Sequence, residues 1–181
     1  KGDQVDSYLL FSNFHRYGFS TDVRFTPIRV VCNNTLTLSL NQKVENSVKI
    51  SHRNKFDADV TKEMLGIAKD KLAQYKEMAS FLGSKKAKDE NIVEYFNRIF
   101  PSTGKKDVSR NAQHAMEILH TQPGAEYAEG SWWQPFNAVT YLTDHVVGRS
   151  ADSRLASAWY GPNKTLKVKA LEKAVEYAEA A

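Results

Sequence analysis

The sequence predicts an α+β fold: a small antiparallel β-sheet, made of a hairpin and a third strand, packed with several α-helices. Strand-forming residues concentrate in residues 1–55, and hydrophobic residues recur at helical spacing through residues 56–181. A chain of 181 residues with 41% hydrophobic content is long enough to bury one sizeable core. We therefore expect residues 1–181 to form a single domain, with a β-rich basic part followed by a helical part.

The strands are expected near the start of the chain. Residues 7–14 and 22–32 are rich in aromatic and β-branched side chains, and Gly18 marks a turn between them, so the pair predicts a hairpin. Asn33 or Asn34 can cap a short helix after the second strand. Residues 47–53 alternate between apolar and polar side chains and predict the third strand.

The rest of the chain predicts helices. Apolar residues at steps of four and three define a long helix over residues 58–82, and Gly83 is expected to stop it. Shorter helices are predicted around residues 92–99 and 112–119. A last amphipathic helix is expected from residue 163 onward.

All three tryptophans fall within residues 131–161, a segment that predicts two helices. Ser131 can cap the first of them. One face of this helix is apolar, with Trp132, Phe136, Val139, Leu142 and Val146. We expect Trp132, Phe136 and Leu142 to be buried against the long helix of residues 58–82.

A second group of side chains in the same segment is polar and consists of Asn137, Tyr141, Asp144 and His145. One interpretation makes them the polar rim of a core helix pair, because stripes at this spacing are usually core. The other makes them a polar site for a ligand or a partner. Both interpretations stay open at the level of the sequence.

The net charge of +4 is placed unevenly along the chain. Residues 1–55 contain eight Lys or Arg and four Asp or Glu, whereas residues 56–181 contain 17 of each kind. The positive excess therefore lies in the first third of the chain. Such a distribution can attract an anionic partner such as nucleic acid.

Aromatic and basic side chains alternate around the expected hairpin. Proteins that bind single strands use this mixture, because rings stack on bases and cations contact phosphates. The candidate nucleic-acid contacts are Arg16, Tyr17, Phe19, Arg24, Arg29, Lys49 and Arg53. In the alternative interpretation the strand aromatics form the buried face of the hairpin, and Arg29 pairs with an internal carboxylate such as Asp144.

Motifs for catalysis or metal binding are weak. Residues 102–106 lack the first glycine of a phosphate-binding loop, and no strand precedes them. His114, Glu117 and His120 depart from the His-Glu-x-x-His pattern of zinc sites. Cys32 stands in an apolar strand, where a buried and inert thiol is expected. We assign no catalytic residue, no metal and no cofactor, and a non-enzymatic role is favoured.

Several motifs resemble one family. Residues 25–36, FTPIRVVCNNTL, resemble the R-V-V-C-x-N-T-L signature of the phage/plasmid-like proteins grouped as domain of unknown function 932. The Trp-rich helix ending in Thr143-Asp144-His145, and the later SRL and WYG segments, are similar to further motifs of that family in the same order. The resemblance spans about residues 8–178. It implies a phage, prophage or plasmid origin, and it implies neither an established activity nor catalytic residues.

The expected context is the cytoplasm of a bacterial host. A lone cysteine fits a reducing compartment, and no apolar run is long enough to cross a membrane. The chain starts at Lys1, whereas family members are usually longer at the N-terminus, so we expect a fragment that lacks the natural N-terminus.

Two functions are compatible with these observations. The first is a non-enzymatic protein that binds or anneals single-stranded DNA in phage or plasmid replication or recombination. The alternative is a protein-interaction or host-takeover factor that binds no nucleic acid, with the hairpin tip or the Tyr141 and Asp144 side chains as its contact surface. Single-stranded DNA, or a host or phage protein, is therefore the expected partner.

Overall fold

The computed structural model describes residues 3–12, 22–29, 34–35, 58–104, 107–148 and 150–181, and for most strand residues it describes the backbone alone. The strands are β1 (Val5–Ser12), β2 (Asp22–Arg29) and β3 (Asn34–Thr35). The α-helices are α1 (Ala58–Ser84), α2 (Asp89–Ile99), α3 (Arg110–Ile118), α4 (Trp133–Tyr141), α5 (Ala151–Tyr160) and α6 (Pro162–Glu179). A 3-10 helix, η1 (Ala125–Ala128), precedes α4, and a π-helical turn, η2 (Leu142–Val146), follows it.

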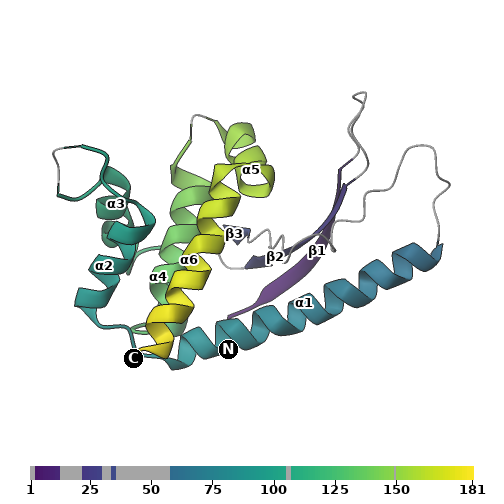
Figure 1. The fold of residues 1–181 in the computed structure, drawn as a ribbon, viewed down its shortest axis with the longest axis horizontal. Helices are drawn as coiled ribbons and strands as arrows, with labels where there is room; N and C mark the ends of the chain where they lie inside the picture. The colour runs from purple at the N-terminus through teal and green to yellow at the C-terminus, as the bar shows by residue number, and fades with distance from the viewer. Residues whose placement is uncertain (1–2, 13–21, 30–33, 36–57, 105–106, 149) are drawn as a thin grey trace.

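The expected α+β class, a sheet packed with helices, is wrong, because the chain is mostly helical. Every buried residue of the described hydrophobic core lies in a helix or caps one. Among the described strand residues, Val5 packs against this core and is itself only partly buried. The core is therefore built between helices, and α4 and α6 lie at its centre (Figure 1).

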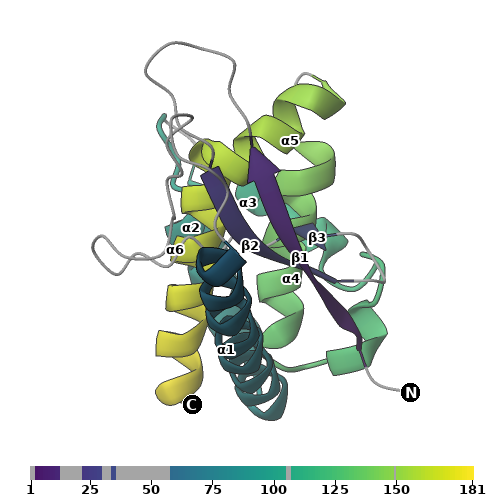
Figure 2. The same cartoon turned by 90° about the vertical axis from the view of Figure 1, so that its right-hand side faces the viewer.

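The strands lie in the order β1-β2-β3 and are antiparallel throughout. Leu9 is opposite Phe25 in this register, and Ser12 is opposite Asp22. Both long strands run alongside α1, away from α2 and α3 (Figures 1 and 2). Asn34 of β3 pairs with Arg29 of β2 and so does not cap a helix, while Asn33 and the residues after Thr35 that were expected to form that helix lie outside the described residues. The third strand predicted over residues 47–53 lies outside the described residues.

Local bonds explain where two helices begin. Ser131 does not cap α4, because its hydroxyl donates to the Ala128 carbonyl at 2.6 Å and Trp132 occupies the N-cap position. The Trp132 amide instead donates to Lys85, just after α1, at 3.0 Å. Helix α5 begins with a capping box in which Ser150 and Ser153 bond each other's backbone amides. Ser150 is thus the N-cap of α5.

Trp132 is the aromatic centre of the core and has no exposed surface. Its indole stacks on Tyr177 of α6 with ring centroids 5.1 Å apart, and it meets Tyr95 of α2 edge-on at 5.6 Å. The Tyr95 hydroxyl donates to the Ala170 carbonyl at 3.0 Å, so this buried ring ties α2 to α6. Offset and edge-on ring pairs of this kind add to the stabilisation from burial alone.

The expected burial of Trp132, Phe136 and Leu142 is confirmed. Their expected partner is only partly right, because Trp132 packs between α2 and α6. From α1, the ring of Tyr75 lies edge-on to Trp133 at 6.1 Å. Four helices therefore meet around the start of α4.

Phe136→Ala should lower the free energy of unfolding by about 3–5 kcal/mol, because it leaves a cavity among buried rings. Chemical denaturation of the full chain measures this difference. Val93→Ala is the control, since Val93 is 43% exposed on α2, and it should change the free energy by about 0.5 kcal/mol or less. Equal stabilities for Phe136→Ala and the wild type would show that α4 does not organise the core.

Candidate functional site

The most polar part of the described core lies at the C-terminal end of α4. The Thr143 hydroxyl lies 3.0 Å from the Val139 carbonyl and 2.9 Å from the Thr140 carbonyl. Thr140 in turn donates to Asn137, and the Asn137 amide donates to Trp133 at 2.7 Å. Each of these buried side chains therefore bonds the backbone of its own helix, which satisfies its polar atoms without a ligand.

The helix then widens into the π turn η2, closed by a hydrogen bond from the Val147 amide to the Leu142 carbonyl at 2.9 Å. Turns of this kind are rare and occur frequently at functional sites. Within this turn, His145 and Val146 are exposed, whereas the Asp144 side chain is only 5% exposed. His145 and Val146 are therefore the parts of η2 that face solvent.

Asp144 forms a buried ion pair with Lys167 of α6. The ammonium donates to Asp144 Oδ1 at 2.6 Å, and the two side chains are only 0% and 5% exposed for Lys167 and Asp144, respectively. Burial lowers the pKa of Lys167, whereas the charge of Asp144 and its hydrogen bond oppose this shift. A buried ammonium is costly unless it is paired, so Asp144 is what allows a lysine at this place.

Lys167 is the residue that sequence reasoning missed. It stands three, seven and eleven positions before Ala170, Ala174 and Ala178, which are all buried on one face of α6. The sequence signal for a buried lysine was its helical spacing with these three alanines. Asn163, one turn earlier, donates to the Thr143 carbonyl at 2.9 Å and attaches the start of α6 to η2.

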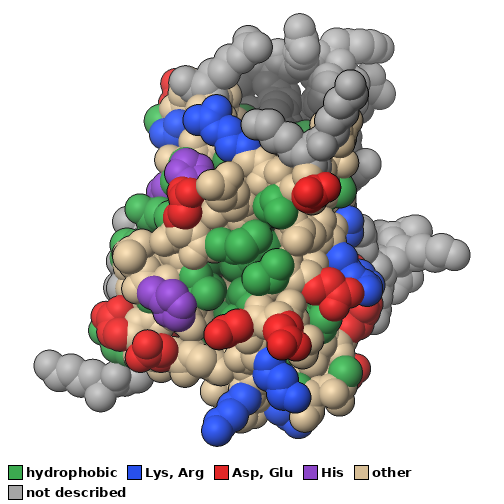
Figure 3. Space-filling model, turned by 90° about the vertical axis from the view of Figure 1, so that its left-hand side faces the viewer, with side chains coloured by type: hydrophobic (Ala, Val, Ile, Leu, Met, Phe, Trp, Pro, Cys, Tyr) green, Lys and Arg blue, Asp and Glu red, His purple; other side chains and the backbone are tan. Residues whose placement is uncertain are grey.

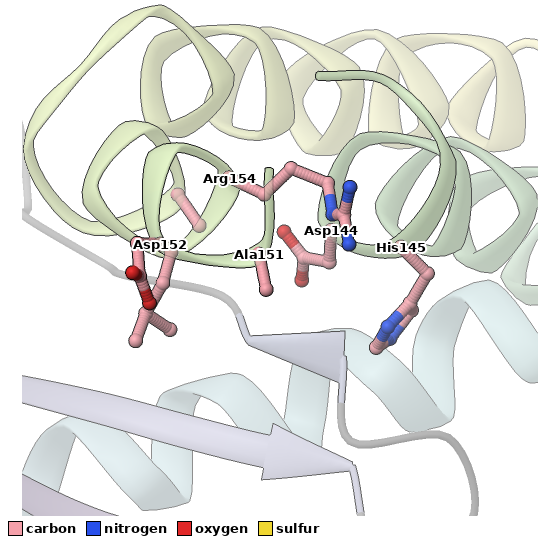
Figure 4. A pocket seen from close by; sticks show the side chains of 7 residues that line it. Asp144, His145, Ala151, Asp152 and Arg154 are labelled. Atoms are coloured by element: carbon pink, nitrogen blue, oxygen red, sulfur yellow. The ribbon is translucent and has the colours of Figure 1, made fainter. Parts of the chain in front are cut away.

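A pocket of about 330 Å³ lies beside the ion pair and is called the η2–α5 pocket (Figure 4). Its lining residues are Asp144 and His145 from η2 and Ala151, Asp152, Arg154, Leu155 and Ala158 from α5. The Arg154 side chain extends across the pocket wall toward Asp144 and His145 (Figure 4). This pocket therefore places a guanidinium, an imidazole and an aliphatic wall around one space.

Gly148 leaves room for the side chain of Arg154. Its φ of +136° is a conformation that side-chain-bearing residues rarely adopt, and a Cβ there would lie 2.6 Å from Arg154 Cγ. The arginine stem passes directly over this glycine. The turn between η2 and α5 thus restricts the position of the aliphatic stem that carries the guanidinium.

The structure keeps three of the four residues of the predicted polar site together and places the fourth elsewhere. Asp144 and His145 both line the η2–α5 pocket, and the Tyr141 ring lies 4.8 Å from the His145 ring. Asn137 is 2% exposed and bonds its own helix instead of the pocket. Three of the four residues therefore lie together, and Asn137 belongs to the core.

Most of the predicted nucleic-acid contacts cannot be placed. Arg16, Tyr17, Phe19, Lys49 and Arg53 lie outside the described residues, as does Cys32. Arg24 and Arg29 lie in β2, opposite Leu10 and Val5, and only their backbone is described. Asp144, the suggested carboxylate for Arg29, binds Lys167.

Among the described residues, no group of three or more His, Cys, Asp and Glu side chains is arranged to hold a metal ion. His114 and Glu117 approach to 3.9 Å on the surface of α3, and His120 bonds Gln134 instead. None of the helices described is both long enough and apolar enough to span a membrane.

Asp144→Asn should lower the free energy of unfolding by about 3 kcal/mol at neutral pH, because it leaves the buried Lys167 ammonium without its charge partner. The loss should shrink as the pH rises through the folded-state pKa of Lys167, which burial already lowers, since a neutral amine needs no counter-ion. Denaturant titrations across alkaline pH measure both effects.

Glu94→Gln is the matched control, because it breaks an ion pair of the same 2.6 Å length between side chains that are 50% and 54% exposed. This variant should leave stability almost unchanged, since water already screens an exposed pair. A pH-independent loss in Asp144→Asn would contradict the assignment of the effect to the Lys167 charge.

Comparison with known proteins identifies one family. Neither a curated protein nor a solved structure matches the chain. The profile of the family described as "Domain of unknown function (DUF932)" matches residues 1–159, which end within α5. The chain therefore belongs to this family, DUF932, as its motifs indicated.

Proposed function

We propose that this domain binds single-stranded DNA without catalysing a reaction, in the replication or recombination of a phage or plasmid. The observation that carries the proposal is a second pocket, of about 370 Å³, between β1 and α1. Three aromatic residues line this β1–α1 pocket: Tyr75, Tyr127 and Trp133. Lys76 also lines it and supplies a cation next to the rings.

The rings around the β1–α1 pocket suit a base. Tyr127 is 43% exposed, whereas Tyr75 and Trp133 are buried and hold the inner wall. Trp133 is oriented by a hydrogen bond from its indole N–H to Asp3 at 2.9 Å. A base that stacks on Tyr127 would cover an aromatic surface that now faces water, which is how single-strand binding proteins gain affinity.

The strands extend this surface along α1. Tyr8 of β1 is 51% exposed and opposite Thr26 in the register. Arg24 stands two positions from Thr26, and alternate positions of a strand share a face. Arg24 is therefore a position of the strand next to β1, in the part of the chain that contains the whole positive excess.

The opposite end of the molecule has a different character. Figure 3 shows the side of α2 and α3, where hydrophobic side chains gather at the centre and both acidic and basic side chains lie around them. The basic side chains on this face stand in separate groups with acidic ones between them, and acidic groups repel phosphates. The β1–α1 side, along which both long strands and α1 run, is therefore the better candidate for a nucleic-acid surface (Figures 1 and 2).

A protein-interaction or host-takeover factor is the second candidate. It is favoured by exposed apolar side chains at η2 and α5, namely Val146, Leu155 and Tyr160, which are 38%, 44% and 38% exposed. A partner protein could cover them. This function would leave the β1–α1 pocket without a role, so we place it second.

Tyr127→Ala should weaken binding to a single-stranded oligonucleotide by about 1–3 kcal/mol and leave the dependence on salt nearly unchanged, because it removes a stacking ring. Lys76→Ala should instead flatten the slope of log affinity against log salt by about 0.7, because it removes one phosphate contact. Fluorescence anisotropy at several salt concentrations separates the two effects.

Tyr160→Ala and Lys169→Ala are the matched controls, since both residues are exposed on other helices. Arg16→Ala and Lys49→Ala are expected to behave as Lys76→Ala, and Tyr17→Ala as Tyr127→Ala. Wild-type affinity at physiological salt no better than that of an ordinary weakly basic protein would refute the DNA proposal and leave the interaction factor ahead.

A further inference from the structure

The η2–α5 pocket holds a cation for which the described part of the chain offers no hydrogen bond or ion pair. This cation is Arg154, a half-buried residue whose side chain crosses Gly148 and extends toward Asp144 and His145 (Figure 4). Its stem is held by packing, because a Cβ at Gly148 would come within 2.6 Å of Arg154 Cγ. The stem of Arg154 is therefore positioned by the fold before any ligand arrives, and the guanidinium extends from it toward Asp144 and His145.

The carboxylate nearest to this pocket does not make it negative. Asp144 is bound to the fully buried Lys167 at 2.6 Å, so their charges cancel at the pocket floor. Asp152 is exposed in the first turn of α5 and lies two positions from Arg154, and helical residues at this spacing do not face each other. The charge that the inner wall presents is consequently that of Arg154.

The chemistry of these walls selects a class of ligand. A guanidinium offers a planar fork of N–H donors that matches two oxygens of a phosphate or carboxylate. A phosphate has a further oxygen for a third donor, and the imidazole of His145 lies on the same side of the pocket. Leu155 and Ala158 form an apolar wall for the body of the ligand.

We propose that the η2–α5 pocket binds a phosphate group, with Arg154 and His145 contacting its oxygens and Leu155 and Ala158 contacting the group that carries it. The volume of about 330 Å³ fits a small phosphate ester. The same chemistry could reach the pocket on a free mononucleotide or on the phosphorylated end of a nucleic-acid strand. The site shares no lining residue with the β1–α1 pocket, so it stands or falls independently of the DNA proposal.

Calorimetric titration of the full chain with thymidine monophosphate, thymidine and inorganic phosphate tests the proposal. We expect the monophosphate to bind and thymidine, which lacks the phosphate, to bind at least about tenfold more weakly. A 5′-phosphorylated oligonucleotide and its unphosphorylated form identify the source of the phosphate. The ligand is a strand end if the phosphorylated oligonucleotide binds more tightly than both its unphosphorylated form and the monophosphate, and if this advantage depends on Arg154.

Arg154→Lys should weaken phosphate binding about tenfold, because it replaces the fork by a single ammonium. Arg98→Lys is the control, since Arg98 is exposed on α2 and already bonded to Glu94. Gly148→Ala should weaken binding similarly in a folded protein, because the new methyl group displaces the Arg154 stem.

Asp152→Asn should strengthen phosphate binding, because it removes a negative charge at the pocket rim. Unfolding can only weaken binding, so a gain in affinity in this variant supports the proposal even if another variant is unstable. Equal affinities for thymidine and its monophosphate, or unchanged phosphate affinity in Arg154→Lys, would overturn the proposal.

Discussion

The ion pair between Lys167 and Asp144 is the constraint on which the placement of α6 against η2 and the core depends. A lysine with no exposed surface must find a carboxylate, and the one it reaches lies on a π turn 23 positions earlier in the chain. Once Lys167 is placed, the same helix brings Ala170 to the Tyr95 hydroxyl and Tyr177 onto Trp132. One buried charge therefore sets the register of α6 against the core.

Helix α6 belongs to the folded unit although the family match ends before it. The match covers residues 1–159, whereas Lys167, Ala170 and Tyr177 all follow. Without α6, Asp144 would lose its ammonium partner, and the indole of Trp132 would lose its stacked ring. The structural boundary of this domain therefore lies beyond the sequence boundary of the family match.

The sequence predicted what depends on local periodicity and missed what depends on contacts between distant segments. The long helix α1 and the burial of Trp132 follow from apolar spacing, and both are present. The fold class was wrong because aromatic and β-branched strands suggested a sheet at the core, whereas the buried rings are on helices. Ser131 failed as a cap because bonds to the segment after α1 and to Ala128 hold it. The π turn has no local signature that separates it from an ordinary helix, and the alanine spacing that indicates a buried Lys167 does not identify Asp144 as its partner.

The buried pair and the η2–α5 pocket are linked through charge. Asp144 lines that pocket, and an unpaired carboxylate there would attract cations and oppose any phosphate. Lys167 cancels this charge from the inside, where solvent and salt cannot screen the interaction strongly. The cation that remains on the pocket wall is Arg154, whose stem packs over a glycine with a positive φ at position 148. A residue that is completely hidden in the core thus determines the sign of the charge that a pocket on the surface presents to its ligand.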